Sequence, residues 1–238
     1  MVQDKVRIRF RKDGDLRFVS HHDLMRSFER MLRRAGLPFR STSGFNPKPR
    51  LVFALSLPLG VVGSGELVDL ELDAEVAPDE VRRRLEAQAP EGLSILDVRR
   101  IERKQSAQVR LVRFHVPVRE QRKKGLADRI QELLQADSCW VERTRPHRRR
   151  IDLRPYLSKI QETDGGLEMQ VVVTTQGTAR PDEILRLLGL GDLIDEGVII
   201  ERTAVILEGE VSMEPPILDN TQTDQQMKKE SHEERNAH

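Results

Sequence analysis

The order of hydrophobic patterns along the first hundred residues is the feature that most restricts the fold. Residues 6–12 alternate between apolar and basic side chains, which is typical of a strand with one buried face. Residues 21–35 repeat apolar positions at helical spacing. Strand, strand, helix and strand patterns follow at 51–59, 66–72, 78–89 and 93–101. The order βαββαβ predicts a ferredoxin-like unit, in which two helices cover one face of an antiparallel sheet.

The second half of the chain repeats this order in outline. Strand patterns at 109–118, 167–175 and 198–207 alternate with helical patterns at 126–134 and 181–188, and 140–144 and 151–160 are extended. We therefore predict an α+β fold of two tandem ferredoxin-like units with antiparallel sheets, at residues 1–104 and 105–210. Residues 211–238 are rich in acidic and amide side chains, so we expect a disordered tail there.

Cysteine content and hydropathy restrict the cofactors and the compartment. Cys139 is the single cysteine, so the chain has no internal disulfide, no Cys-x-x-Cys zinc site and no iron–sulfur cluster of its own. No run approaches the ~20 apolar residues that cross a bilayer, and the N-terminal residues lack the apolar segment of a secretory signal. We expect a cytoplasmic protein without membrane contact, metal or cofactor of its own.

The formal net charge of +1 conceals a strong segregation of charge along the chain. Residues 1–50 contain 13 Lys and Arg against 5 Asp and Glu, whereas residues 66–80 contain seven acids and no base. A second basic cluster, at 143–154, has six arginines and one Asp. A nucleic acid responds to local potential rather than to net charge, so these clusters are candidate contact surfaces. The alternative is that they are ordinary solvated surface charges.

A row of arginines follows one side of the first predicted helix. The apolar positions Leu24, Phe28 and Met31 define the buried face, and the arginines fall on the opposite stripe. Such a stripe spans about two turns and suits contacts to neighbouring phosphates, although it is also compatible with a solvated helix face. The first strand adds arginines that we expect to face outward. The residues are Arg26, Arg30, Arg33 and Arg34 on the helix, and Arg7, Arg9 and Arg11 on the strand.

The segment 43–60, SGFNPKPRLVFALSLPLG, combines a basic loop with an apolar run. Pro47 and Pro49 exclude helix, so residues 43–50 form a shaped loop, and residues 51–59 are predicted to be a core strand. The loop has the side chains to hold an anionic ligand by stacking, charge and hydrogen bonds, or it is a rigid connector. The candidate contact residues are Phe45, Asn46, Lys48 and Arg50.

Two further groups are candidate sites. His21 and Asp23 begin the first helix beside Ser20, and they are weak candidates for acid–base chemistry because no activated nucleophile or third metal ligand accompanies them. We interpret Ser20 as a helix cap and His21 as a structural residue. Arg148, Arg149 and Arg150 are predicted to form a basic hairpin tip that either touches nucleic acid or deters edge-to-edge pairing of sheets.

Four segments together resemble the radical-SAM-linked protein family, a domain of unknown function encoded beside, or fused to, radical S-adenosylmethionine proteins. The segments are FVSHHDLMRSFERMLRRAGLPF (18–39), SGFNPKPRLVFALSLPLGVVGSGELVD (43–69), IDLRPYL (151–157) and ARPDEIL (179–185). His22 departs from the family pattern, which often has Leu at this position. The resemblance implies a radical SAM protein as partner, and the iron–sulfur cluster and S-adenosylmethionine are expected only in that partner.

These observations lead to a non-catalytic module that binds RNA, either tRNA or rRNA, and works with a separately encoded radical SAM enzyme. The basic clusters motivate the RNA, and the resemblance motivates the enzyme partner. Two alternatives remain open at this point. One is a metal-independent RNA-processing nuclease that uses His21, and the other is an adaptor that binds only the radical SAM protein.

Overall fold

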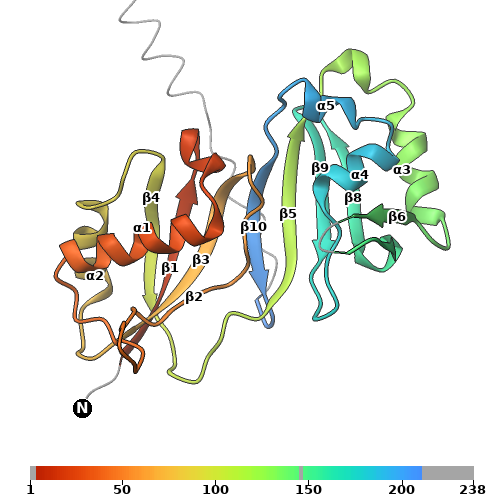
Figure 1. The fold of residues 1–238 in the computed structure, drawn as a ribbon. Coiled ribbons are helices and arrows are strands. Elements are labelled where there is room, and N and C mark those ends of the chain that lie inside the picture. Colours follow the sequence, from red (N-terminus) through yellow and green to blue (C-terminus); the bar gives the residue numbers. More distant parts are fainter. Residues whose placement is uncertain (1–3, 145–146, 211–238) are drawn as a thin grey trace, which may run out of the picture. The chain divides into compact units, whose positions relative to one another are not determined.

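The computed structural model describes residues 4–144 and 147–210, and the predicted disordered tail at 211–238 lies outside these residues. Residues up to Glu208 form one compact unit, and a separate unit begins at Gly209. The first unit is a mixed α/β structure with a mostly antiparallel eight-stranded sheet, in agreement with the predicted class (Figure 1). The predicted domain boundary at 104/105 falls within this unit, between two strands.

The strands and helices fall close to the patterns seen in the sequence. The strands are β1 (Asp4–Lys12), β2 (Leu51–Phe53), β3 (Val62–Leu72), β4 (Leu93–Arg100), β5 (Val109–Pro117), β6 (Trp140–Arg143), β7 (Arg149–Asp152), β8 (Leu157–Thr163), β9 (Gly166–Val172) and β10 (Glu201–Leu207). The helices are α1 (His21–Arg34), α2 (Pro78–Glu86), α3 (Leu126–Gln135), α4 (Pro181–Leu187) and α5 (Asp192–Asp195), with 3-10 turns η1 (Gly14–Phe18), η2 (Glu120–Arg122) and η3 (Arg154–Tyr156).

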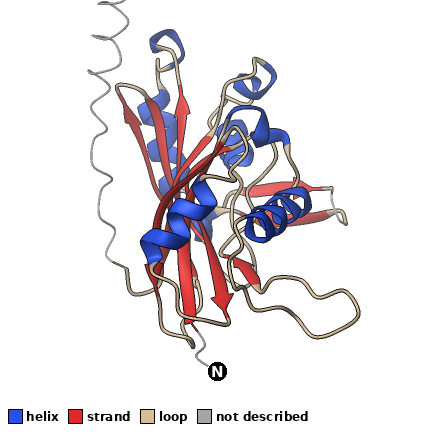
Figure 2. Cartoon of the chain, turned by 90° about the vertical axis from the view of Figure 1, so that its left-hand side faces the viewer, coloured by secondary structure: helices blue, strands red, loops and turns tan. Residues whose placement is uncertain are grey.

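Both halves of the unit order their strands in the same way. The main sheet runs β4-β1-β3-β10-β5-β9-β8, and β2 also pairs with β3. The first four strands along the chain therefore lie in the order β4-β1-β3-β2, and β10-β5-β9-β8 repeats it. All these pairs are antiparallel except β3 with β10. Figure 2 shows the twist of this sheet, which is usual for paired strands.

The core of the first half forms where α1 and α2 pack on the sheet. The alternating apolar residues of β1 are buried against the apolar stripe of α1, as their periodicities predict. Phe10 and Phe28 meet with ring centroids 5.0 Å apart, and Phe53 of β2 lies 5.3 Å from Phe28. These edge-to-face contacts fix α1 across β1 and β2.

The two halves join through β3 and β10 in a way that the sequence patterns did not predict. Val62 and Gly63 pair in parallel with Glu201 and Arg202. Beside this short pairing the buried Arg202 guanidinium donates to both oxygens of the Glu66 carboxylate, with Nε 2.7 Å from Oε1. Arg202 also donates to the Ser56 carbonyl at 3.1 Å. A buried ion pair therefore links the strands at the junction.

The prediction that the arginines of the first strand form an outward basic face is wrong for Arg7. Its side chain is only 1% exposed and bonds bidentately to Asp69 of β3, at 2.7 and 3.0 Å. Lys5 lies 3.4 Å from the same carboxylate. The antiparallel register places Asp69 directly opposite Arg7, so an acid from the acidic segment neutralises a base of β1. Arg9 and Arg11 are half-buried.

The predicted core strand at 51–59 is also wrong beyond Phe53. The Ala54 amide still donates to the Leu67 carbonyl at 2.9 Å, but residues 56–61 leave the sheet. Pro58 has no amide to donate to a neighbouring strand, and Gly60 adopts φ +80°, which an L side chain rarely tolerates. The predicted strand at 151–160 is likewise divided into β7 and β8 by the turn η3 around Pro155.

Within the described residues, no helix has both the length and the apolar composition needed to cross a membrane.

Candidate functional site

The N-terminus of α1 is organised by a serine cap. The Asp23 amide donates to Ser20 Oγ at 3.2 Å, and Ser20 Oγ donates to the Asp23 carboxylate at 2.7 Å. The bond from Ser20 and the nearby Arg26 hold the pKa of Asp23 below its usual value. The predicted helix cap is therefore confirmed.

His21 lies against the aromatic core of the first half rather than in an open site. Its ring is edge-on to Phe53, with centroids 5.2 Å apart. Burial lowers the pKa of His21, and the neighbouring His22 and Lys12 lower it further. His21 therefore favours the neutral form. The described residues contain no group of three or more His, Cys, Asp or Glu side chains able to hold a metal ion.

The predicted arginine stripe is exposed to solvent along α1. Arg26 lies 3.3 Å from Asp23, an exposed ion pair that contributes little to stability. Arg30 donates to Ser27 Oγ at 3.1 Å and forms no ion pair within residues 4–144 and 147–210. Arg34 donates to the Gln88 carbonyl at 3.0 Å, near the end of α2. Among the described residues, a paired carboxylate offsets only the Arg26 charge of the stripe, so the stripe retains positive charge.

The loop at 41–50 is a closed, hairpin-like excursion. Ser41 and Pro49 form an isolated β-bridge, and the Thr42 amide donates to the Lys48 carbonyl at 2.8 Å. The Lys48 amide in turn donates a hydrogen bond to Thr42 Oγ1 at 3.1 Å. At the tip, Gly44 adopts φ +130° and Phe45 is fully exposed. The loop therefore presents an aromatic ring to solvent from a base held by backbone bonds.

The structure brings this loop and the arginine stripe together through Arg33. The Arg33 guanidinium donates to the Pro47 carbonyl at 3.2 Å and lies 5.5 Å from the centroid of the Phe39 ring. Arg33 thus supports the loop as well as carrying charge. Because Arg33 joins the stripe to the loop, we treat the exposed positive residues of α1 and the exposed side chains of the loop as one candidate surface. We call it the α1–loop surface: Arg26, Arg30, Arg33, Arg34, Phe45, Asn46 and Lys48.

Arg50 belongs to the base of the loop rather than to its exposed tip. Its guanidinium lies 3.4 Å from the Glu71 carboxylate, which Arg40 also approaches at 3.8 Å. The Nε of Arg50 is buried. The charge of Arg50 is therefore partly neutralised, and its geometry suits anchoring of the loop to β3.

The second predicted basic cluster lies on the β6–β7 hairpin, in the other half of the unit (Figure 1). Arg148 bonds bidentately to Glu142 across the hairpin, at 2.6 and 3.2 Å. The Arg150 guanidinium stacks on the Trp140 ring at 5.1 Å. Arg149 is exposed. The structure does not bring this cluster to the α1–loop surface, because α1 packs on β1 and β2 in the first half whereas Arg143 joins the hairpin to Glu183 of α4 in the second.

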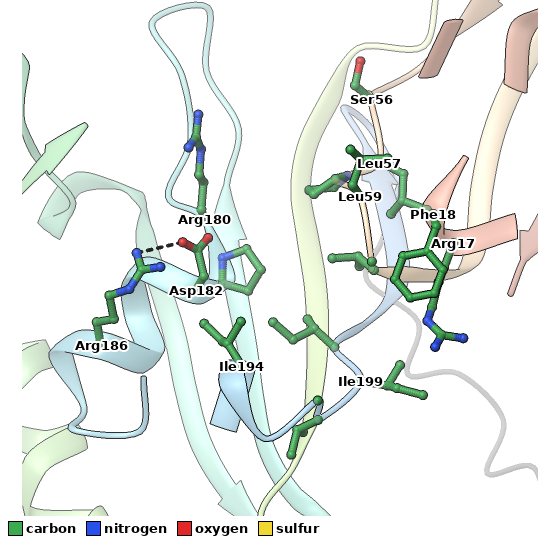
Figure 3. A pocket seen from close by; sticks show the side chains of 17 residues that line it. Arg17, Phe18, Ser56, Leu57, Leu59, Arg180, Asp182, Arg186, Ile194 and Ile199 are labelled. Carbon is green, nitrogen blue, oxygen red and sulfur yellow. Dashed lines mark hydrogen bonds and ion pairs between the residues drawn. The ribbon is translucent and has the colours of Figure 1, made fainter. Parts of the chain in front are cut away.

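The sequence patterns missed a cavity between the two halves, with a volume of about 720 Å³ (Figure 3). Its walls come from η1, from the loop that replaces the predicted strand end, from the start of α4, and from the segment before β10. The exposed apolar residues at 59 and 199 lie in runs that were predicted to be strands, so no local motif marks them as part of a cavity wall. The arginines and the exposed apolar residues of the cavity wall are Arg17, Phe18, Leu59, Arg180, Arg186 and Ile199.

Comparison with family models gives a match over residues 5–181 to a family described as "Uncharacterized protein conserved in bacteria (DUF2344)". The chain belongs to this family. The matched region includes the α1–loop surface and the β6–β7 hairpin, and it ends at the start of α4. The family description names no activity, ligand or partner.

Curated proteins gave no match to this chain. One solved structure that it resembles is titled "Crystal Structure of an Unknown Protein from Galdieria sulphuraria", with 15% identity and a TM-score of 0.26. The alignment covers 86% of this chain and 100% of that one. At this level of similarity the match carries no argument about fold or function.

Proposed function

We propose that this member of the family is a non-catalytic RNA-binding module that contacts tRNA or rRNA through the α1–loop surface. The observation that carries the proposal is the full exposure of Phe45 on a braced loop beside unpaired basic side chains. Packing a ligand on the faces of a fully exposed Phe removes apolar surface from water, which favours binding. An unstacked base is a suitable cover, because every base has a face that packs on an aromatic ring.

The charge around Phe45 supports RNA rather than a neutral ligand. Residues 21–50 contain seven Lys and Arg against two acids, a net charge of +5. Arg30 and Lys48 form no ion pair within the described residues, so both are available to phosphates. Phosphate contacts supply sequence-independent affinity, and stacking on Phe45 adds a preference for unpaired bases. A single-stranded loop of a structured RNA offers both features.

We further propose that each half is a ferredoxin-like unit. The repeated strand orders β4-β1-β3-β2 and β10-β5-β9-β8, each with intervening helices, support this assignment. RNA-binding versions of this fold commonly stack bases on aromatic residues of the open sheet face. Here β1 carries Arg7 buried against Asp69 instead, which favours contact through the helix and loop.

The proposed partner is a radical SAM enzyme, to which this module presents the RNA. This part of the proposal rests on the four segments that resemble the radical-SAM-linked family, and the enzyme would supply its own iron–sulfur cluster and S-adenosylmethionine. Copurification from cells, with and without nuclease treatment, tests it. Retention of the enzyme after nuclease treatment supports direct protein contact, whereas loss of the enzyme indicates that RNA bridges the two.

Fluorescence anisotropy with labelled total tRNA tests the RNA contact. We expect Phe45→Ala to weaken binding by about tenfold, because one base–aromatic stack contributes ~1–3 kcal/mol. Arg30→Glu and Lys48→Glu should each weaken binding and reduce the slope of log affinity against log salt concentration by about 1.

Matched controls are available elsewhere on the unit. Phe18→Ala removes another exposed phenyl ring, and Lys159→Glu reverses an exposed charge on β8, so both should leave RNA binding unchanged. Binding that survives Phe45→Ala and does not depend on salt would overturn the proposal. Electrophoresis of the RNA after long incubation tests the nuclease alternative, since cleavage that His21→Ala abolishes would replace a binding role by a catalytic one.

A further inference from the structure

The cavity between the halves is lined mainly by apolar side chains, several of which remain open to solvent. Phe18 is 60% exposed, Leu59 64% and Ile199 44%. Figure 3 shows Phe18, Leu57 and Leu59 on one wall, Ile199 below Phe18 near Arg17, and Ile194 toward the other side. Large apolar side chains gathered in one hollow are unusual on a solvated surface and mark a binding site. Cavities of this size, about 720 Å³, hold drug-sized ligands.

Charged side chains on the cavity wall are mostly positive. Three arginines, Arg17, Arg180 and Arg186, line it with a single carboxylate, Asp182. Arg186 bonds to Asp182 at 2.9 Å, and the Arg17 guanidinium lies 4.3 Å from the centroid of the Phe18 ring. Arg180 is exposed and forms no ion pair within the described residues. The cavity therefore combines an apolar wall with at least one cation available to a ligand.

Arg180 and Asp182 come from the wall opposite Phe18 and Leu59 (Figure 3). A ligand that spans the cavity therefore meets mainly apolar surface on one side, where Arg17 is the charged residue, and the Arg180 cation on the other. Ser56 is the only uncharged polar side chain that lines the cavity among the described residues, and it is exposed. Against the wall of Phe18, Leu57 and Leu59, the hydrogen-bonding edge of a nucleobase would find no side-chain partner, which disfavours a base there. An aliphatic body has no such requirement.

We propose that this cavity binds an amphiphilic anion, a molecule with an aliphatic body and a carboxylate or phosphate head group. The body lies against Phe18, Leu59 and Ile199, and the head group pairs with Arg180. Burial of apolar surface supplies most of the affinity, and the charge-assisted bond sets the orientation. The site is separate from the α1–loop surface, so the proposal does not depend on RNA binding.

Isothermal titration calorimetry with three probes of equal chain length tests the proposal. The probes are decanoate, decyl phosphate and decyltrimethylammonium, each kept below its micelle concentration. We expect one of the anions, or both, to bind, and the cation to bind at least about tenfold more weakly, because the head group would face Arg180. The relative affinity of the two anions identifies the preferred head group.

Two variants locate the site. Ile199→Trp fills the cavity with a bulkier side chain, and Arg180→Glu reverses the charge; both positions are exposed, so folding should be preserved. Each should weaken binding of the anion by at least about tenfold, and Arg180→Lys should retain most of it. The control variants Phe45→Ala and Trp140→Ala remove exposed aromatic rings outside the cavity and should not affect binding.

Three outcomes would overturn the proposal. The first is no binding of either anion, and the second is equal affinity for anion and cation. The third is a dimer in sedimentation velocity that Ile199→Trp dissociates, which would mean that a second copy of the chain covers the apolar walls. RNA binding by Ile199→Trp and Arg180→Glu should be unchanged, so failure of either proposal is distinguishable from failure of the other.

Discussion

At the scale of single residues, the burial of His21 predicts how the stability of the protein depends on pH. Its pKa is lowered mainly by burial against Phe53, so the unfolded chain binds a proton at this position more readily than the folded protein does. The contribution of His21 to stability is complete above the unfolded pKa of about 6.5 and decreases as the pH falls through that value toward the folded pKa. We expect the ring protons of His21 to titrate below about pH 6.5 in NMR spectra.

A matched pair of variants isolates this effect. His21→Phe keeps an aromatic ring against Phe53 without a titratable group, and it should reduce the loss of stability between about pH 7.5 and 5.5. His22→Asn changes an exposed neighbour and should leave most of that loss in place. A His21 resonance that titrates at or above the value of an unstructured peptide would contradict the prediction.

The charged residues show which parts of the candidate site can be predicted from the sequence and which cannot. Periodicity placed Arg26 and Arg30 on the solvent side of α1, because a helical face is a local property. The burial of Arg7 and the pairing of Arg50 with Glu71 depend on strand register, which joins residues far apart in the chain. No local pattern carries that information. Whether a charged side chain remains available to a ligand is therefore known only once the sheet is assembled.

At the scale of elements, the β6–β7 hairpin is fixed to α4 by a buried ion pair. Arg143 bonds bidentately to Glu183 at 2.6 and 2.7 Å and also donates to the Thr178 carbonyl at 2.7 Å. Burial opposes ionisation of Glu183, but the bonds from Arg143 and from the Arg180 amide hold the pKa of Glu183 below its usual value. The pair is therefore intact at neutral pH, and its contribution is lost as the pH falls through the folded pKa of Glu183.

We expect Glu183→Gln to lower the free energy of unfolding by about 3–5 kcal/mol, because it leaves the Arg143 charge buried without its counterion. Urea denaturation followed by the fluorescence of Trp140, which lies on β6, measures this change. Asp182→Asn removes a partner of the more exposed Arg186, so this control should change stability by less than about 1 kcal/mol. Equal effects of the two variants would contradict the assignment of Arg143–Glu183 as the structural anchor.

Elements with strong periodicity were predicted well, and irregular ones were not. α1 begins directly after its serine cap and ends before Gly36, as the sequence indicates. The apolar run after Phe53 has the composition of a strand but forms a cavity wall, because Pro58 and Gly60 prevent it from continuing along the sheet. The cavity escaped prediction because its walls come from segments distant in sequence and become neighbours only in the folded unit.

At the scale of the whole unit, the two halves share one sheet and part of one hydrophobic core. The order of elements predicted the mixed α/β class, but only two residue pairs join β3 to β10, too few to leave a sequence signal. Leu57, Val61 and Leu67 of the first half pack into the core cluster of the second. The buried Arg202–Glu66 pair lies at the same junction. Unfolding of one half would therefore expose apolar and charged groups of the other.

This coupling predicts that the halves unfold together. Phe28→Ala removes a large side chain from the core of the first half and should cost about 3–5 kcal/mol. Trp140, the single tryptophan, reports only on the second half. In a coupled unit, Phe28→Ala shifts the urea midpoint seen by Trp140 fluorescence as far as the one seen by far-ultraviolet circular dichroism. Val52→Ala, at an exposed position of β2, should shift neither. If Phe28→Ala leaves the Trp140 transition in place and produces a separate earlier transition in circular dichroism, the halves are independent folding units.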